Sequence, residues 1–303
     1  MDPLSQGALG ASVPQSFADR QHLRVACLLG FLGGMAPDLD ILIQSPVDPL
    51  LFLEFHRQFT HALIFIPFGG MICGAILYAA FAKRFLSLKQ SLLYCTLGYA
   101  THGLLDACTT YGTQLFWPFS DVRIAWNNVS VVDPTFTLPV LILMIIGVVA
   151  RRSLYTKIGL GWAVFYLLLG VVQNERAEAL GRDIASDRGH DPVRLEAKPG
   201  FANLLVWKIV YEFDGRYYVD AVRVGMETTA FPGESIEKLD LDRHFPWLNP
   251  NSQQARDVER FRWFSNDYLA VDQERENFIV DVRYSILPNE IDALWGITLS
   301  PDA

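Results

Sequence analysis

Hydrophobic residues along the chain gather in long uncharged runs that short basic loops separate. The longest, Ala62–Ala82, has 21 residues without a charged side chain, and two others have 17 each. A helix needs about 20 mostly apolar residues to cross a bilayer, with a range of roughly 17–25. The predicted segments are Val25–Pro37, Ala62–Ala82, Ser91–Gly112, Pro134–Ala150 and Ile158–Asn174. The first is short, so it is expected either to complete a span together with Gln21–Arg24 or to be a partly inserted helix. This pattern predicts an all-α polytopic membrane bundle of about five segments.

Charge divides the chain near Gln173–Asn174. Residues 1–173 carry 10 Lys/Arg and 9 Asp/Glu, whereas residues 174–303 carry 15 and 24. We therefore expect a membrane-embedded domain over 1–174 and a small, acidic, soluble α+β domain over 175–303. Its predicted helices are Glu175–Arg188 and Ala255–Tyr268, and its predicted strands are Leu204–Phe213, Tyr217–Val224, Phe278–Leu287 and Leu294–Leu299. The net charge of −8 argues against a nucleic-acid partner.

Basic residues predict how the bundle is threaded. They cluster in two short loops and before the first apolar stretch, namely Arg20, Arg24, Lys83, Arg84, Lys89, Arg151, Arg152 and Lys157. By the positive-inside rule these clusters face the cytoplasm. Loops 38–60 and 113–133 and the acidic domain are then expected outside, on a multi-pass protein of the inner membrane. The partner of that extracytoplasmic domain is not predicted.

Polar residues inside the apolar stretches are costly, which makes them candidates for function. His102 and Asp106 have the spacing i, i+4, which places both on one helix face. An imidazole and a carboxylate so placed can reach one divalent ion. The alternative is a His–Asp hydrogen bond that only satisfies both groups within the bundle.

Two further clusters fall at the same predicted outer surface and join this pair as candidates. The predicted metal ligands are Asp40, His56, His61, His102 and Asp106, with Asp38 beside them. Helix capping is the alternative role for Asp38 and Asp40. Nitrogen and oxygen donors without thiolate suit Zn²⁺ first, with Mn²⁺ or Fe²⁺ as alternatives. Because the candidates exceed one tetrahedral shell, a dinuclear centre is also considered.

Three residues are predicted to act on a substrate. Arg57 lies between two candidate ligands, where a guanidinium can hold a phosphate, or else contact lipid headgroups as an interfacial arginine. A carboxylate not bound to metal, Asp38 or Asp133, is expected to act as a general base. The aromatic loop Gln114–Phe119 is expected at the membrane interface.

These stretches together resemble a known family, the membrane-bound metal-dependent hydrolases of the inner membrane, formerly known only as a domain of unknown function. The matching motifs are Met1-Asp2-Pro3-Leu4, Pro37-Asp38-Leu39-Asp40, His56-Arg57, Thr60-His61, His102 with Leu105-Asp106, Thr109 and Gly112, Trp117-Pro118-Phe119 and Asp133-Pro134. The resemblance covers most of residues 1–150 and implies a helical membrane protein with a divalent-metal site and a hydrolase activity of undefined substrate. The family often has Thr-His soon after the first methionine, where this chain has Ser5-Gln6; that departure bears on metal occupancy.

These residues are compatible with three functions. The first is a metal-dependent hydrolase at the outer face of the inner membrane, acting on lipid or other phosphoesters at headgroup depth, with the ion lowering the pKa of water. The second is a non-catalytic, metal-stabilised scaffold whose external domain binds a partner. The third, an ion transporter, is disfavoured because the spans Pro134–Ala150 and Ile158–Gln173 have few polar residues.

Overall fold

The computed structural model describes residues 1–301 and separates the chain into two compact units. The first comprises residues 1–47, 55–171 and 201–203, and the second residues 48–54, 172–200 and 204 onward. The main division falls between Val171 and Val172, inside a continuous helix. The predicted boundary near residue 174 therefore lies in the middle of that helix rather than in a linker.

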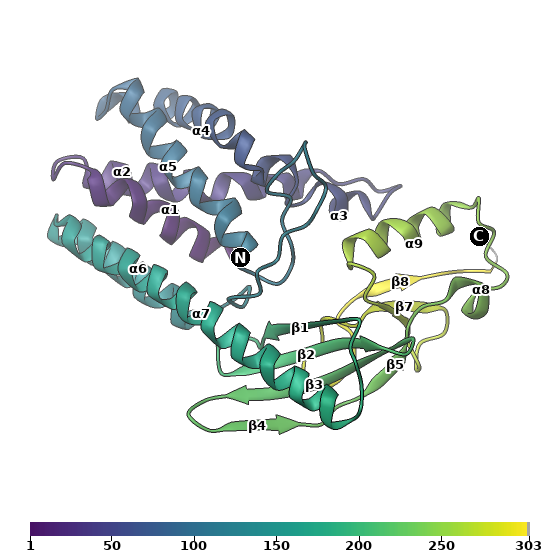
Figure 1. Ribbon diagram of the computed structural model, residues 1–303. Helices are drawn as coiled ribbons and strands as arrows, with labels where there is room; N and C mark the ends of the chain where they lie inside the picture. Colours follow the sequence, from purple (N-terminus) through teal and green to yellow (C-terminus); the bar gives the residue numbers. More distant parts are fainter. Residues whose placement is uncertain (302–303) are drawn as a thin grey trace. The chain divides into compact units, whose positions relative to one another are not determined.

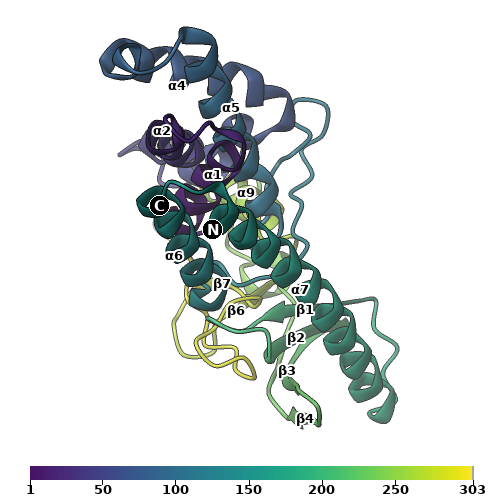
Figure 2. The same cartoon turned by 90° about the vertical axis from the view of Figure 1, so that its left-hand side faces the viewer.

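The first unit is a bundle of helices that lie side by side (Figures 1 and 2). The α-helices are α1 (Pro3–Phe17), α2 (Leu23–Met35), α4 (Ile66–Ala80), α5 (Leu88–Ala107), α6 (Pro134–Ala150) and the first half of α7 (Ser153–Asp187). Short 3-10 helices are η1 (Ala36–Leu42), η2 (Phe59–His61), η3 (Leu63–Phe65) and η4 (Ala82–Arg84). Helix α5 packs against α1, α2 and α4, and α6 packs against α1.

Helix α1 is not predicted by any apolar run, because it is built largely from small and polar residues. Its buried positions are mostly glycine, alanine, serine and glutamine. A Cβ at Gly10 would lie 2.7 Å from the Gly30 carbonyl oxygen, and one at Gly98 would lie 2.3 Å from the same oxygen. Close backbone approach of this kind holds helices together in a membrane without large apolar side chains.

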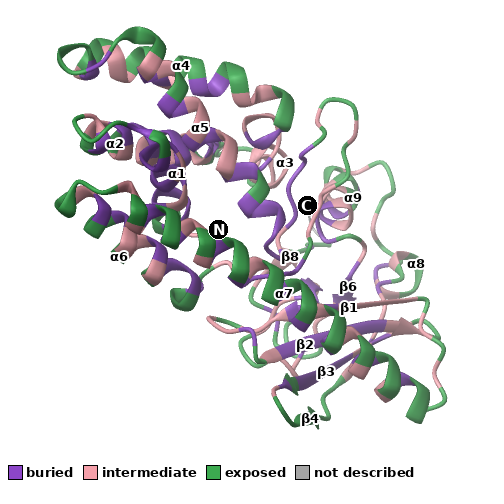
Figure 3. Cartoon of the chain, turned by 60° about the vertical axis from the view of Figure 1, so that its left-hand side comes forward, coloured by how far each residue is buried: buried purple, intermediate pink, exposed green. Residues whose placement is uncertain are grey.

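Three helical segments among the described residues are long and apolar enough to cross a membrane: Leu23–Leu42, Leu63–Ala80 and Ser153–Asp187. Pro134–Ala150 is a shorter apolar helix that matches its predicted bounds. Most of α4 is exposed or half-buried, with only Gly69, Gly70 and Gly74 buried (Figure 3). Such an apolar, exposed helix is typical of a lipid-facing segment. The predicted number of about five segments stays a prediction.

The second unit contains two antiparallel sheets. The first has the order β1 (Arg194–Pro199), β2 (Val206–Phe213), β3 (Arg216–Val224), β4 (Thr228–Phe231), with β5 (Ser235–Glu237) also paired to β3. The second has the order β6 (Leu269–Val271), β7 (Phe278–Asp281), β8 (Gly296–Thr298). The helices are α3 (Leu51–Phe55), α8 (Leu241–His244), α9 (Gln253–Phe264) and the end of α7. Both sheets contribute to one core that includes Val210, Val219 and Val280.

The predicted hairpin is confirmed. Phe213 pairs with Arg216 around Asp214 and Gly215, which have φ angles of 48° and 68°. Two positive φ angles are the signature of the two-residue turn that best joins twisted strands. Several predicted bounds are wrong. The strand starting at Phe278 ends at Asp281, α9 ends at Phe264, and the two helices predicted on either side of residue 174 are the single helix α7.

Candidate metal centre

The 3-10 helix η1 continues α2 and presents two aspartates. Side chains three residues apart share a face of such a helix. Pro37 and Asp40 therefore lie on one face, and both are buried. Asp38 lies on the next face, and its side chain is 21% exposed.

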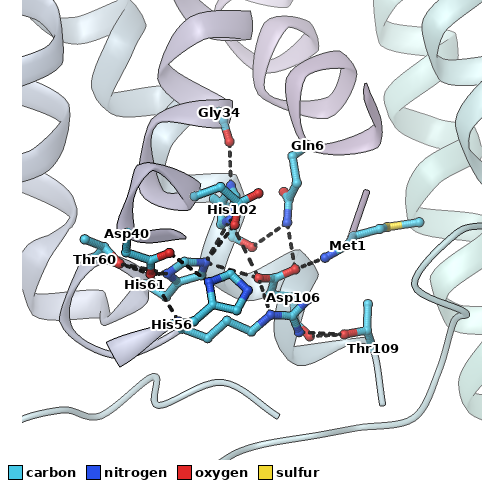
Figure 4. A network of polar contacts seen from close by, with 12 residues as sticks. Met1, Gln6, Gly34, Asp40, His56, Thr60, His61, His102, Asp106 and Thr109 are labelled. Carbon is cyan, nitrogen blue, oxygen red and sulfur yellow. Dashed lines mark hydrogen bonds and ion pairs between the residues drawn. The ribbon is translucent and has the colours of Figure 1, made fainter. Parts of the chain in front are cut away.

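The segment from His56 to His61 folds over these aspartates. Arg57 has a φ of 65°, which turns the chain sharply, and its backbone N–H donates to Asp40 Oδ2 at 3.1 Å. The Thr60 hydroxyl donates to the same oxygen at 2.7 Å and lies 2.9 Å from His61 Nδ1. Because this hydroxyl gives its proton to Asp40, it accepts the one on Nδ1. Nε2 of His61 is then left facing the site (Figure 4).

Helix α5 supplies His102 and Asp106 one turn apart, as their spacing predicts, and both are fully buried. His102 Nδ1 lies 2.5 Å from the Gly34 carbonyl oxygen. A carbonyl only accepts hydrogen bonds, so Nδ1 carries the proton and Nε2 the lone pair. Both histidines therefore aim an Nε2 atom at the same point, and a backbone or side-chain oxygen fixes each ring from behind.

Four donor atoms from three separate stretches of chain converge at this point. The two Nε2 atoms of His61 and His102 are 2.9 Å apart. Asp38 Oδ1 lies 3.4 Å from the first and 3.2 Å from the second. Asp106 Oδ2 lies 3.2 Å and 3.6 Å from the same two atoms. These residues form a group able to hold one metal ion.

The spacing and the unsatisfied atoms of this group fit a divalent cation. Ligands about 2.1 Å from a tetrahedral ion lie about 3.4 Å from one another, close to the distances seen here. Two imidazole nitrogens that face each other need a proton or a metal ion between them. The buried Oδ2 of Asp106 and Oε1 of Gln6 have no hydrogen-bond partner among the described residues. These two oxygens therefore retain lone pairs that no hydrogen bond uses.

A second group adjoins the first and shares one carboxylate with it. Asp38, Asp40 and His56 also bring their donor atoms within metal-binding range of one another. His56 Nδ1 lies 2.8 Å from Asp40 Oδ1. The five residues predicted as ligands and Asp38 thus all lie in these two groups, with Asp38 common to both. That they bind metal stays a prediction.

Arg57 and Asp133 lie in different surroundings. The Arg57 Nε atom is 3.2 Å from Asp106 Oδ2, and its Nη1 donates to the Thr109 hydroxyl at 3.1 Å. Asp133 caps α6 by accepting from the backbone of Thr135 and Phe136, and Oδ2 accepts from the Tyr166 hydroxyl at 2.8 Å. Asp133 belongs to neither metal-binding group. Its predicted role as a base stays a prediction.

Two contacts of Asp106 are not predicted from the sequence. Gln6 Nε2 donates to Asp106 Oδ1 at 2.9 Å, and the Met1 nitrogen donates to the same oxygen. The sequence singles out Gln6 only as a departure from the family pattern. A polar side chain one turn into a helix of small residues is the signal that marks it, because such a side chain needs a partner when the helix is buried. Helix α1 therefore contributes directly to the site.

The comparisons with known proteins bear on residues 1–177, which match the family described as YdjM inner membrane protein. YfhP of Bacillus subtilis (strain 168), described as uncharacterized, is 27% identical over 132 residues, which are 43% of this chain and 39% of that protein. The inner membrane protein YbcI of Escherichia coli (strain K12) is 31% identical over 106 residues, 34% of this chain and 60% of that one. The matches thus span less than two thirds of either relative. No solved structure matches this chain.

The matched region contains the whole helical bundle and both metal-binding groups, and it ends inside α7. The sheets of the second unit lie beyond it. Apolar helices exposed along their length agree with the membrane location in the family's description. This chain belongs to the YdjM inner membrane protein family.

Proposed function

We propose that this protein is a membrane-bound, metal-dependent hydrolase of phosphoesters, lipids among them, that works at the outer face of the inner membrane. The observation that carries the proposal is the convergence of Asp38 Oδ1, His61 Nε2, His102 Nε2 and Asp106 Oδ2. Each Nε2 atom lies 2.9–3.6 Å from the other three donor atoms. Three of these side chains are fully buried, and Asp38 is partly exposed. The donor set, without thiolate, suits Zn²⁺ best, with Mn²⁺ or Fe²⁺ as alternatives.

A divalent ion at such a site supplies Lewis acidity and lowers the pKa of water. The protein's own groups then divide the remaining work. Asp38 is the member of the group nearest solvent. With the ion held by the other donors, Asp38 is the carboxylate placed to take a proton from water as a substrate is attacked. Asp40 and Thr60 hold the His61 ring, and Arg57 holds Asp106 and adds positive charge for an anionic substrate. The group shared by Asp38, Asp40 and His56 supports a dinuclear centre.

The distribution of basic residues supports an external site. Lys83 and Arg84 lie in η4, between α4 and α5, at the end of α5 opposite to His102 and Asp106. By the positive-inside rule that end faces the cytoplasm, so the histidines lie near the outer face. The second unit follows α7 on the same outer side. Its acidic charge and its place after the last apolar helix fit an extracytoplasmic domain that meets a partner.

A metal-stabilised scaffold is the second candidate, and one observation favours it. The side chains of His61, His102 and Asp106 are fully buried. Asp106 also accepts hydrogen bonds from Met1 and Gln6 and forms an ion pair with Arg57. A closed shell is typical of structural metal sites, whereas catalytic sites keep an open position. The exposed edge of Asp38 is the opening that the hydrolase needs.

Metal analysis of the purified protein tests the site. We expect about one or two equivalents of metal in wild type and a clear loss in His61→Ala and in His102→Ala. His244→Ala is the control, because this histidine belongs to α8 of the second unit. Equal metal content in wild type and all three variants would show that His61 and His102 do not bind metal, and it would contradict both candidate functions.

Turnover then separates enzyme from scaffold. Phosphomonoesters and phosphodiesters bearing lipid headgroup analogues are offered to the metal-loaded protein. The hydrolase is expected to lose at least about 100-fold in rate in Asp38→Asn while metal bound through the other ligands is retained. Bound metal without turnover on any of these substrates would favour the scaffold.

A further inference from the structure

The partly exposed ligand Asp38 lies beside an apolar face. Helix η1 has three residues per turn, so Leu39 and Leu42 share a face. They are 64% and 75% exposed, and Ile41, which shares the face of Asp38, is 44% exposed. The same short helix thus buries Asp40 and exposes aliphatic side chains on the face of Asp38 and on the next face.

A second loop adds aromatic residues to the same part of the unit. Gln114 N donates to the Arg57 carbonyl at 3.0 Å and Leu63 N donates to the Leu115 carbonyl at 2.9 Å, which fixes this loop against the ligand segment. The Trp117 ring is 6.1 Å from that of Phe59. Its neighbours Phe116 and Phe119 are 51% and 81% exposed.

Exposing the apolar side chains of η1 and of the loop Gln114–Phe119 to water is unfavourable. Exposed apolar patches of this kind mark contacts with membranes or partners. Here the patch is continuous with lipid-facing chain, because Leu39 and Leu42 belong to the apolar segment Leu23–Leu42 and the next apolar segment starts at Leu63. Residues 36–47 contain neither lysine nor arginine, so they have no cation to draw a soluble anion to this edge.

We infer that the site opens towards the bilayer and that its substrate is a phosphoester with acyl chains, which reaches Asp38 from the membrane along Leu39, Ile41 and Leu42. This inference rests on the proposed function and narrows its substrate class. The acyl chains would lie against the η1 face while the phosphate meets the cluster and Arg57. A soluble phosphoester lacks the chains that this face accommodates.

The depth of the η1 face is measured without any reliance on activity. A fluorophore is attached to Leu42→Cys, and to Val193→Cys as the control, because Val193 is 78% exposed in the second unit. Label on the wild-type cysteines gives the background. In vesicles of phosphatidylglycerol and phosphatidylethanolamine, lipids brominated on the acyl chain should quench the probe at position 42 at least about threefold more than the probe at 193. Equal quenching would overturn the inference.

Turnover tests the substrate class. Leu39→Ser/Leu42→Ser should lower hydrolysis of a long-chain phospholipid at least about tenfold more than hydrolysis of its soluble, short-chain analogue. Phe17→Ser is the matched control, since this exposed residue ends α1. An equal loss on both substrates, or cleavage of the soluble analogue alone by wild type, would overturn the lipid inference but keep the hydrolase. A wild type that cleaves neither overturns the proposed function, and quenching then decides alone whether this face meets lipid.

Discussion

Thr60 shows how a single hydroxyl orders the site. It donates to Asp40 Oδ2 and accepts from His61 Nδ1, so it connects the two metal-binding groups. Thr60→Val keeps the shape and removes both contacts. Loss of such an outer-shell partner typically costs about 10–100-fold in metal affinity. Competition with a fluorescent zinc chelator measures this change, and Thr101→Val is the control because its hydroxyl donates to the Gly98 carbonyl of its own helix. Equal affinities in the two variants would contradict the role assigned to Thr60.

Lys208 gives the second unit a distinctive pH dependence. Burial lowers its pKa to about 7, although Asp281 and Glu234 oppose the shift. Between pH 7 and 10.5 the unfolded chain therefore binds one proton more than the folded chain, and stability rises with pH. The contribution is up to about 1.4 kcal/mol per pH unit.

Thermal unfolding of the full-length protein in detergent, at pH 7.5 and 9.0, measures this effect. The Lys208→Met variant should lack the Lys208 contribution, so its advantage over wild type should be larger at pH 7.5 than at pH 9.0. Near-ultraviolet circular dichroism follows the aromatic core of the second unit. Parallel pH slopes in the two proteins would show that Lys208 does not titrate in this range.

At the level of elements, α5 must approach the segment His56–His61 very closely. A Cβ at Gly103 would lie 2.2 Å from the His61 carbonyl oxygen. Gly103→Ala should therefore displace His61, lower metal affinity at least about tenfold and lower the melting temperature by several degrees. Gly161→Ala is the control, since no atom lies within 4 Å of its added Cβ. That variant should be neutral or stabilised by about 0.4–1 kcal/mol. Equal behaviour of the two alanine variants would contradict this packing.

Helix α9 holds the segment 48–54, which lies in sequence between the two ligand pairs. Arg260 makes a two-pronged contact with Asp48, at 2.9 and 3.0 Å, and donates to Glu54 at 2.5 Å. These groups are partly exposed, so their loss is expected to raise the open population only about fivefold. Arg260→Gln should accordingly speed chymotrypsin cleavage at Leu51–Phe55 about fivefold. Arg256→Gln, one turn earlier, should leave the cleavage rate unchanged. Equal acceleration in both variants would contradict the role of Arg260 in holding this segment.

The sequence predicts those elements whose own residues carry a strong signal. The spacing of His102 and Asp106, the run Pro134–Ala150 and the Asp214–Gly215 turn are all local patterns, and the structure has each of them. Helix α1 escapes prediction because close packing on α2 stabilises it, and such packing depends on residues far away in the sequence. The 3-10 geometry of η1 places Asp40 and Leu39 on different faces. It also escapes prediction, because it depends on the segment His56–His61 that folds over η1.

For the whole molecule, α1 adds a segment to the predicted topology. Its first turns reach the metal-binding groups, because Gln6 contacts Asp106. Its far end packs at the other end of α5, since Ala18, Leu23, Ala82 and Leu86 share one core cluster. Helix α1 therefore runs from the site to the basic loop, and α2 runs back. With α4, α5, α6 and α7 we therefore predict six membrane segments. Helix α7 has 35 residues, about 52 Å, so it extends beyond a hydrocarbon core of about 30 Å.

This topology predicts which positions an impermeant maleimide reaches in intact cells. Val47→Cys and Glu227→Cys should react from outside, since both sites are exposed and belong to the outer loop and the second unit. Asp19→Cys and Lys83→Cys should react only after permeabilisation, because both lie at the end of the bundle where basic residues gather. Wild type reports labelling of the native cysteines, which are buried or half-buried. Because α1 and α2 are joined at Asp19, labelling of Asp19→Cys from outside would place this loop on the outer side and contradict the threading of α1 and α2.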